Sequence, residues 1–386
     1  MSGLAAAGPE DMARLLALGE LLGRPAIAFD EFPLRKLVRN RRILVTGAGG
    51  SIGSELVRQI AALGPGHLTL IENSEFNLYA IDQYLREHRP EVSRTSVFCD
   101  IRDRNVLDDW FTREQPDVVF HAAALKHVPM AEDHPLESIR TNLLGARHVA
   151  DACQSHNVGV MVFVSTDKAV NPSSVMGAAK RAAEAYCQAM DLEAGPTRFV
   201  SVRFGNVLGS SGSVAPLFQR QIAEGGPITL THPDVSRYFM TLGEAVSLLL
   251  QAATLREMPS EVRGGVYVMD IGDPIRIADL ARLMIRMSGR RPEQDIEVRV
   301  IGLRPGEKLD EELIHPDEDR ILRTASGLSL VGPRTMALDA LRACFDRMQD
   351  AVTRLDREAA ITHLREIVPE FEPIGSETGL PSAVNS

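Results

Sequence analysis

The chain has 386 residues, of which 44% are hydrophobic, and its formal net charge is −10. A chain of this length can bury a large core, and we expect it to form two lobes. The negative charge argues against nucleic acid as the main partner. The four cysteines show no CxxC spacing, which indicates reduced thiols in a cytoplasm rather than a disulfide or zinc framework, and no metal is expected.

The N-terminal segment, residues 1–40, is predicted to hold a short helix over Met12–Leu22 and then an arm that contains Pro25 and Pro33. No apolar run in the chain approaches the roughly 20 residues that a membrane helix needs. We therefore expect no direct membrane insertion of this chain, although it could be the soluble part of a longer, membrane-anchored protein.

A strand, a glycine turn and a helix come next. The apolar run Ile43–Val45 predicts a buried strand, and the residues after the turn show the period of an amphipathic helix. Three glycines at three-residue intervals would let the backbone approach a pyrophosphate, which amides at the helix N-terminus can bind. The cradle would consist of Gly47, Gly50, Ser51, Ile52 and Gly53. The alternative is a tight turn that binds no ligand.

The ends of the next three predicted strands carry residues suited to a dinucleotide. Leu68–Ile71 ends at Glu72, whose carboxylate can accept hydrogen bonds from both ribose hydroxyls of an adenosine and would repel a 2′-phosphate. This favours NAD over NADP; the alternative is a solvated charge at a strand end. Further cofactor contacts are expected at the ends of the strands Ser96–Cys99 and Val118–Phe120 and in the helix Leu136–Gln154, from Asn73, Asp100, Ile101, Ala122, Ala123, Ala124, Lys126 and Asn142.

Polar side chains follow the fifth predicted strand, Met161–Val164. The run Ser165–Lys168 stands at the mouth of a buried strand, where such groups are costly unless they are used. A functional role is therefore preferred over a satisfied turn. The helix from about Ser174 to Met190 places Met176 and Lys180 four residues apart, on one face.

The second half of the chain is less regular. A sixth strand, Phe199–Phe204, leads into a polar, glycine-rich loop at 205–213 that could wrap a ligand. Arg237 and the segment Gly302–Lys308 carry charges that suit a nucleotide diphosphate, although either arginine alone is more often a surface residue. The remaining predicted elements are strands at 227–230 and 266–271, helices at 242–255, 277–287 and 351–367, and a disordered tail from Ile374.

The alternation of strands and helices predicts an α/β fold with a doubly wound parallel sheet of the Rossmann type and a smaller, mixed α/β lobe. We divide the chain into an N-terminal helix and arm (1–40), an NAD-binding domain (41–205), a substrate-binding lobe with some segments returning to the first domain (206–345), and a C-terminal helix with its tail (346–386).

Taken together, these residues resemble the extended short-chain dehydrogenase/reductase superfamily. Within it, the chain is most similar to the nucleotide-sugar 4,6-dehydratases of bacterial capsule, lipopolysaccharide O-antigen and protein-glycan synthesis, which act on UDP-N-acetylglucosamine. The resemblance covers about Leu22 to Arg323. Its most specific pieces are Thr46–Glu55, Ala124–Pro129, Ser165–Pro172, Met176–Arg181, Arg203–Ser213 and Leu303–Leu313.

The chain departs from the superfamily at Met176. Most members have a tyrosine four residues before the lysine that corresponds to Lys180, and methionine cannot ionise to take a proton from a sugar hydroxyl. A subgroup of the dehydratases is similar in carrying methionine here. That subgroup is associated with retention at C5 and often has an N-terminal membrane region.

The resemblance implies a reaction and a set of roles. NAD would take hydride from C4, a proton would leave C5, the 6-hydroxyl would leave as water, and hydride would return to C6. Lys168 would be the C5 base, which requires a lowered pKa, and Asp167 would protonate the leaving hydroxyl. The group that accepts the 4-hydroxyl proton stays open, and Asp167 could accept it and then pass it to the 6-hydroxyl. Thr166 would hydrogen-bond the 4-oxygen, and Lys180 would hold the nicotinamide ribose. The UDP-sugar is expected to contact Lys126, His127, Asn206, Val207, Ser213, Val214, Thr229, Arg237, Arg304 and Glu307.

Two other functions remain open at this stage. An NAD-dependent UDP-sugar 4-epimerase would return hydride to C4 without losing the C5 proton, and the pair Asp167–Lys168 argues against it. A non-catalytic NAD-binding regulator is supported only by Met176. The related enzymes imply a homo-oligomer, a dimer or larger.

Overall fold

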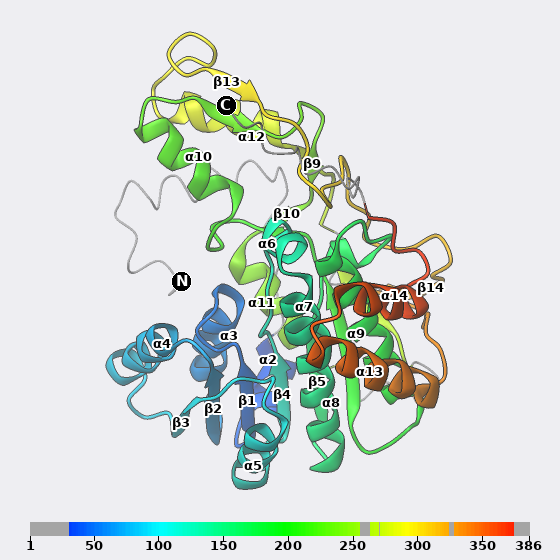
Figure 1. The fold of residues 1–386 in the computed structure, drawn as a ribbon. Helices are drawn as coiled ribbons and strands as arrows, with labels where there is room; N and C mark the ends of the chain where they lie inside the picture. The colour runs from blue at the N-terminus through cyan, green and yellow to red at the C-terminus, as the bar shows by residue number, and fades with distance from the viewer. Residues whose placement is uncertain (1–30, 255–262, 270, 324–327, 374–386) are drawn as a thin grey trace.

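The computed structural model describes residues 31–254, 263–269, 271–323 and 328–373. The larger lobe is built on strands β1 (Arg42–Thr46), β2 (His67–Glu72), β3 (Arg94–Phe98), β4 (Val118–His121), β5 (Val160–Val164), β6 (Arg198–Arg203), β11 (Val266–Met269), β14 (Arg320–Arg323) and β15 (Leu328–Val331). They form one nine-stranded sheet in the order β14-β15-β11-β6-β5-β4-β1-β2-β3 (Figure 1). The strands from β11 to β3 run parallel, and β14 and β15 add an antiparallel edge. The predicted doubly wound α/β fold is therefore confirmed.

Helices cover both faces of this sheet because successive strand residues point to opposite sides. Ile43 and Val45 pack with one helix layer, and Leu44 between them packs with the other. The first layer contains α2 (Glu31–Val38), α3 (Ser51–Ala62), α4 (Glu75–His88) and α11 (Leu242–Thr254). The second contains α5 (Arg104–Glu114), α8 (Ala146–Ser155), α9 (Val175–Leu192), α13 (Leu338–Thr353) and α14 (Arg357–Ile367).

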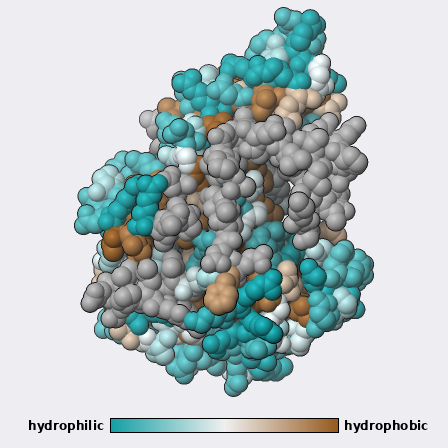
Figure 2. Space-filling view, turned by 180° about the vertical axis from the view of Figure 1, so that it is seen from behind, coloured by the Kyte–Doolittle hydropathy of each residue, from teal (hydrophilic) through white to brown (hydrophobic). Residues whose placement is uncertain are grey.

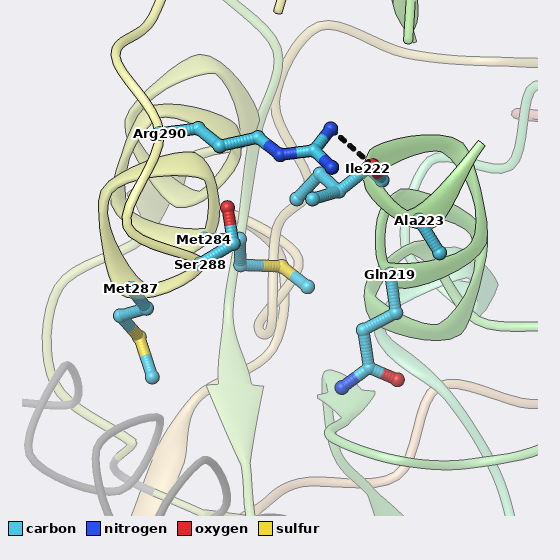
Figure 3. A pocket seen from close by; sticks show the side chains of 7 residues that line it. All are labelled: Gln219, Ile222, Ala223, Met284, Met287, Ser288 and Arg290. Carbon is cyan, nitrogen blue, oxygen red and sulfur yellow. Dashed lines mark hydrogen bonds between the residues drawn. The ribbon is translucent and has the colours of Figure 1, made fainter. Parts of the chain in front are cut away.

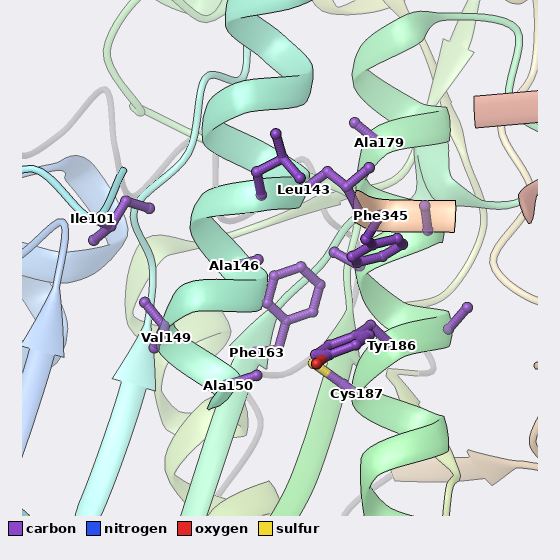
Figure 4. Close-up of a cluster of buried hydrophobic side chains, with 14 of the residues drawn as sticks. Ile101, Leu143, Ala146, Val149, Ala150, Phe163, Ala179, Tyr186, Cys187 and Phe345 are labelled. Atoms are coloured by element: carbon purple, nitrogen blue, oxygen red, sulfur yellow. The ribbon is translucent and has the colours of Figure 1, made fainter. Parts of the chain in front are cut away.

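The second layer is centred on α9, which is buried along almost its whole length. Tyr186 of α9 stacks on Phe345 of α13 with ring centroids 5.0 Å apart, and Phe163 of β5 lies in the same cluster (Figure 4). Strand β5 and the start of α9 carry the predicted catalytic residues. A rigid core therefore supports both segments from behind.

The predicted helix Leu136–Gln154 is three helical pieces in the structure: α7 (Pro135–Ile139), a π-helical turn η1 (Arg140–Gly145) and α8. A π-helical turn widens the helix locally, and such turns are frequent at functional sites. Asn142 lies in this turn, fully buried, and its side-chain amide bonds both the N–H and the C=O of Leu125 at 2.8 Å. Asn142 thus braces the segment after β4, which continues into α6 (Val128–Asp133), and its contact with the cofactor stays a prediction.

The smaller lobe lies at the top of Figure 1 and has its own core between α10 (Val214–Ala223), β8 (Ile228–Leu230) and α12 (Ile277–Met287). Three two-stranded sheets complete it: β7 (Asn206–Val207) with β10 (Phe239–Met240), β9 (Ser236–Arg237) with β12 (Ile275–Arg276), and β8 with β13 (Val298–Val300). Strands β11, β14 and β15 come from the same half of the chain and lie in the large sheet. The exact domain boundaries stay a prediction.

Two predictions about elements were wrong. Helix α2 occupies the expected arm and includes Pro33, which is tolerated because it falls in the first turn. The C-terminal region contains two helices, α13 and α14, rather than one, and Asp356 caps the second by accepting from Ala359 N at 3.0 Å. Strands β14 and β15 were not predicted. The predicted helix at 12–22 and the tail from Ile374 lie outside the described residues.

In the described part of the chain, no helix is long and apolar enough to cross a membrane. Figure 2 shows hydrophilic side chains covering much of the upper and lower ends of the rear face.

Candidate active site

The glycine turn between β1 and α3 forms a close-packed cradle. Gly47 has a positive φ of 66°, and a Cβ on Gly53 would lie only 1.9 Å from the carbonyl oxygen of Gly47. The alanine run after β4 packs against the same turn, since a Cβ on Gly47 would lie 2.7 Å from Ala123 Cα. Only residues without a side chain fit this turn. This is the packing that a dinucleotide-binding turn requires, so these residues fit a bound NAD.

The substitution Gly53→Ala should weaken NAD binding about 10- to 100-fold, because overpacking of this kind costs about 1–3 kcal/mol and displaces the Gly47 carbonyl. Titration calorimetry of NAD into cofactor-free protein would measure the effect. Gly243→Ala is the matched control, because no heavy atom lies within 4 Å of its added Cβ. Equal affinities in the two variants would contradict the predicted cradle.

Two acidic residues lie at the carboxyl edge of the sheet, as predicted for a dinucleotide site. Glu72 is buried at the end of β2 and accepts hydrogen bonds from the backbone N–H of Gly49 at 3.0 Å and of Asn73 at 3.1 Å. Asp100 follows β3 and binds Arg102. Glu72 therefore also fixes the glycine turn. Its contact with a ribose stays a prediction.

The predicted catalytic run follows β5, and the structure brings its side chains together with Asn206. Lys168 Nζ lies 3.0 Å from Asp167 Oδ1 and 3.2 Å from Asn206 Oδ1. Thr166 Oγ1 donates to the same Asp167 oxygen at 2.9 Å. Asp167 is fully buried, while Thr166 and Lys168 remain partly exposed. The carboxylate therefore lies behind the hydroxyl and the ammonium that face the cleft side.

The protonation of Lys168 differs from the prediction. The base role requires a lowered pKa, and burial does act in that direction, but the nearby carboxylates of Asp167 and Glu311 raise the pKa of Lys168 above its ordinary value. Glu311 Oε1 lies 3.5 Å from Lys168 Nζ. Lys168 is thus a protonated ammonium in this structure, not the free amine that a base must be.

Helix α9 begins directly against this cluster. A Cβ on Gly177 would lie 2.2 Å from the carbonyl oxygen of Lys168, so only glycine allows this approach. Met176, beside it, is buried, and Lys180 one turn later donates from Nζ to the Val164 carbonyl at 2.9 Å. Lys180 Nζ also lies 4.5 Å from the centroid of the Phe163 ring. The structure therefore holds Lys180 at the end of β5, beside the catalytic run.

The activity should fall above about pH 8. Burial lowers the pKa of Lys180 to about 8, so its ammonium loses the proton there, and with it the charge expected to hold the nicotinamide ribose. Lys180→Arg keeps a cation at every accessible pH and should lack this alkaline decline, even if its kcat is lower. The pH dependence of kcat for the wild type and this variant tests the assignment. The same decline in both would contradict it.

On the other side of the cleft, Arg237 is buried and donates to the carbonyls of Lys308 at 2.8 Å and Leu309 at 2.9 Å. Its guanidinium thus anchors the 307–311 segment, and its phosphate contact stays a prediction. Glu307 accepts from Thr231 Oγ1 at 2.9 Å. Arg304 is exposed and donates its backbone N–H to Glu307 at 3.2 Å, whereas Thr229 bonds Gln221 on α10.

The glycine-rich loop reaches back to the dinucleotide cradle. Ser51 at the start of α3 bonds both the N–H and the hydroxyl of Ser211, at 3.2 and 3.3 Å. A Cβ on Gly212 would lie 2.5 Å from Cε1 of His127, so this loop also packs on the segment after β4. Ser213 and Val214 start α10, and Val207 pairs with Met240. The loop therefore joins the predicted cofactor and substrate sides.

Comparison with known proteins now adds to this geometry. The family model described as "Polysaccharide biosynthesis protein" matches residues 43–328. The chain belongs to this family.

Members of the polysaccharide biosynthesis family are similar over most of the present chain. It is 46% identical to the capsular polysaccharide biosynthesis protein CapD of Staphylococcus aureus over 78% of this chain. The match covers only 49% of CapD, so the present chain spans about half the length of that relative. It is 32% identical to a UDP-N-acetylglucosamine 4,6-dehydratase (inverting) of Campylobacter jejuni, over 78% of this chain and 86% of the relative.

Solved structures resemble the fold. The X-ray structure of Pen from Bacillus thuringiensis superposes with a TM-score of 0.69 at 28% identity, over 80% of this chain and 97% of that one. A UDP-glucose 4-epimerase of Thermus thermophilus in complex with NAD superposes with a TM-score of 0.58 at 23% identity. The match covers 71% of this chain and 90% of that one. The chain thus has the Rossmann-like fold of the short-chain dehydrogenases/reductases, and the proteins that it resembles include a 4,6-dehydratase and a 4-epimerase of UDP-sugars.

One cavity lies beside the large sheet, and another lies in the smaller lobe. A cavity of about 340 Å³ borders the catalytic cluster and is lined by Tyr238, Glu311, Glu312 and residues of β11 and β15. Another, of about 250 Å³, lies between α10 and α12 in the smaller lobe, where Arg290 donates to the Ile222 carbonyl (Figure 3). No predicted site residue lines either cavity, but the first lies next to the catalytic run through Glu311, whose Oε1 is 3.5 Å from Lys168 Nζ.

Sequence reasoning missed several residues at the site. Glu311 contacts Lys168, Ser211 contacts Ser51, and His121 is buried with Nδ1 2.7 Å from Thr46 Oγ1. Burial and the nearby charge of Lys180 lower the pKa of His121 to about 3, so the ring is neutral. Glu311 lies within Leu303–Leu313, one of the segments that carry the family resemblance. The acidic residues beside it were the only signal in the sequence that pointed to a role at the site.

Proposed function

We propose that this chain is an NAD-dependent nucleotide-sugar 4,6-dehydratase that converts UDP-N-acetylglucosamine to a UDP-2-acetamido-2,6-dideoxy-4-keto-hexose. The contact that supports this most directly is the 3.0 Å pair of Asp167 and Lys168 beside the end of β5. Loss of water across C5 and C6 needs an acid and a base beyond the group that takes the 4-hydroxyl proton, whereas 4-epimerisation needs no such additional pair. The 32% identity to a dehydratase of this substrate agrees with the proposal.

When bound, NAD supplies the acceptor for the C4 hydride and the donor for the hydride that returns to C6. The protein positions the sugar and moves its protons. Lys180 would orient the nicotinamide ribose, and the cradle at Gly47 and Gly53 would hold the pyrophosphate.

The buried carboxylate of Asp167 would exchange protons with the sugar through Thr166. The Thr166 hydroxyl already donates to Asp167 Oδ1 at 2.9 Å, and it is partly exposed. As the sugar 4-hydroxyl gives its proton to Thr166 Oγ1, the threonine proton passes to Asp167. The reverse transfer then protonates the 6-hydroxyl, which leaves as water. Asp167 ends the cycle as the carboxylate with which it began.

Incubation with UDP-N-acetylglucosamine, followed by mass spectrometry and proton NMR of the product, tests the proposal. A dehydratase gives a product that has lost one water and, in deuterated buffer, carries deuterium at C5. An unchanged mass with inverted C4 would instead identify a 4-epimerase. Tight NAD binding with no change in any UDP-sugar would identify a binding protein.

We further propose that the enzyme is a homo-oligomer that works in the cytoplasm. All four cysteines are free and buried in the structure, which suits a reducing compartment. Size-exclusion chromatography with light scattering would measure the assembly.

A further inference from the structure

A second buried carboxylate contacts the proposed C5 base. Glu311 is only 7% exposed, and its Oε1 lies 3.5 Å from Lys168 Nζ and 3.9 Å from Arg237 Nε. Its Oε2 is buried without a hydrogen-bond partner among the described residues. A buried carboxylate with an unsatisfied oxygen is costly, so its presence here calls for a reason.

The main chain around Glu311 is held from several sides. Lys308 Nζ donates to the Val170 carbonyl at 2.9 Å, which attaches the segment to the catalytic turn after β5. Ser236 Oγ donates to Asp310 at 2.5 Å, and Arg237 donates to the Leu309 carbonyl at 2.9 Å. Glu311 is therefore fixed against Lys168 by the smaller lobe and the large lobe together.

The pKa of Glu311 is raised in the free enzyme, with burial as the largest cause and charges of both signs around it. Burial raises the pKa of Glu311, and Asp167 raises it further, while Lys168, Arg237 and Lys308 lower it. About a fifth of the Lys168 side chain, 20%, is still exposed to water, which stabilises its ammonium. A sugar lying on Lys168 would remove that water. In a drier site a neutral amine and a neutral acid become favoured over an ion pair.

We propose that Glu311 is the positioning residue that takes a proton from Lys168 when the sugar covers the site, so that Lys168 becomes the free amine that removes the C5 proton. The N–H bond at Nζ breaks, the O–H bond at Oε1 forms, and the pair changes from charged to neutral without any co-reactant. Lys168 then takes the C5 proton and later gives it back, while Glu311 keeps its proton throughout the turnover. This inference rests on the proposed dehydratase function.

Glu311→Gln tests it, because glutamine has nearly the same size and cannot take up the proton. Glu87→Gln is the control: Glu87 lies exposed on α4, outside the site, and its carboxylate accepts from Gln83 Nε2 at 2.7 Å. In Glu311→Gln we expect C4 oxidation to continue, so that the absorbance of reduced nicotinamide accumulates, while water loss and deuterium uptake at C5 fall about 100-fold. Glu87→Gln should behave as the wild type.

The pH profile separates this role from a structural one. Without Glu311, Lys168 has to lose its proton to solvent. Below about pH 8, where Lys180 keeps its proton, the residual rate of water loss in Glu311→Gln should therefore rise with pH while the wild type is flat. Equal rates in Glu311→Gln and Glu87→Gln would overturn the inference, as would an equal loss of C4 oxidation and water loss with an unchanged pH profile. A wild type that removes no water would overturn the proposed function, and the inference with it.

Discussion

Asp167→Asn should lower kcat for water loss about 1,000-fold, the middle of the range for removal of a general acid–base group. The asparagine amide can still accept from Lys168 Nζ and Thr166 Oγ1, which now lie 3.0 and 2.9 Å from Asp167 Oδ1, so the shape of the site is kept. The asparagine amide cannot take up a proton, so a proton that the sugar gives to Thr166 cannot pass on to residue 167. Unlike Glu311→Gln, this variant should stop before C4 oxidation, because the 4-hydroxyl proton has nowhere to go.

Single-turnover measurements of reduced nicotinamide and of product distinguish the two variants. Asp317→Asn is a control for the loss of one carboxylate, since the Asp317 side chain is 78% exposed and far from the run after β5 in sequence. Thermal unfolding should show that Asp167→Asn remains folded. Near-full turnover in Asp167→Asn would show that the proton path runs elsewhere.

Much of the site could be predicted from the sequence because parallel strands place their carboxyl ends along one edge. Glu72, Asp100 and Asp167 each follow a short apolar run, and topology alone brings these ends into one row. The glycine turn was predictable from the local sequence, because a Cβ at Gly53 would collide with the Gly47 carbonyl of the same turn. These features depend on local sequence and on a common architecture.

The partners of individual charges could not be predicted in the same way. Arg237 was a candidate phosphate ligand, yet backbone carbonyls of the 308–309 segment accept its hydrogen bonds. The pKa of Lys168 was expected to be lowered by burial, but its neighbour Asp167 and, from a distant segment, Glu311 raise it. Such outcomes depend on loop packing between the lobes, which leaves no periodic signal in the sequence. The C-terminal helix pair was missed because the break at Leu355, with φ of 59°, has no glycine or proline to mark it.

Arg203→Met should lower the free energy of unfolding by about 3–5 kcal/mol, the cost of leaving buried carboxylates without their cation. Arg203 ends β6 and is fully buried. Its guanidinium donates to both oxygens of Glu184 on α9, at 2.8 and 2.7 Å, and to both oxygens of Glu318, at 2.8 and 2.7 Å. One cation thus joins the sheet, the helix that carries Lys180, and the loop after Glu311.

Urea unfolding gives the free energy, provided that the m-values of variant and wild type agree. Arg299→Met is the control: Arg299 lies 3.0 Å from Glu297, but both side chains are 57% exposed, so its loss should change stability by less than about 0.5 kcal/mol. Equal effects of the two substitutions would mean that the buried network contributes little.

The same substitution should also move the pH profile of the enzyme. Glu184 lies one helical turn from Lys180 and raises the pKa that burial lowers to about 8. In Arg203→Met the charge of Glu184 is no longer balanced by the guanidinium, so its pull on the Lys180 proton strengthens. The alkaline decline in kcat should therefore move to higher pH in any Arg203→Met protein that still folds. An unmoved profile would mean that Glu184 has itself become protonated.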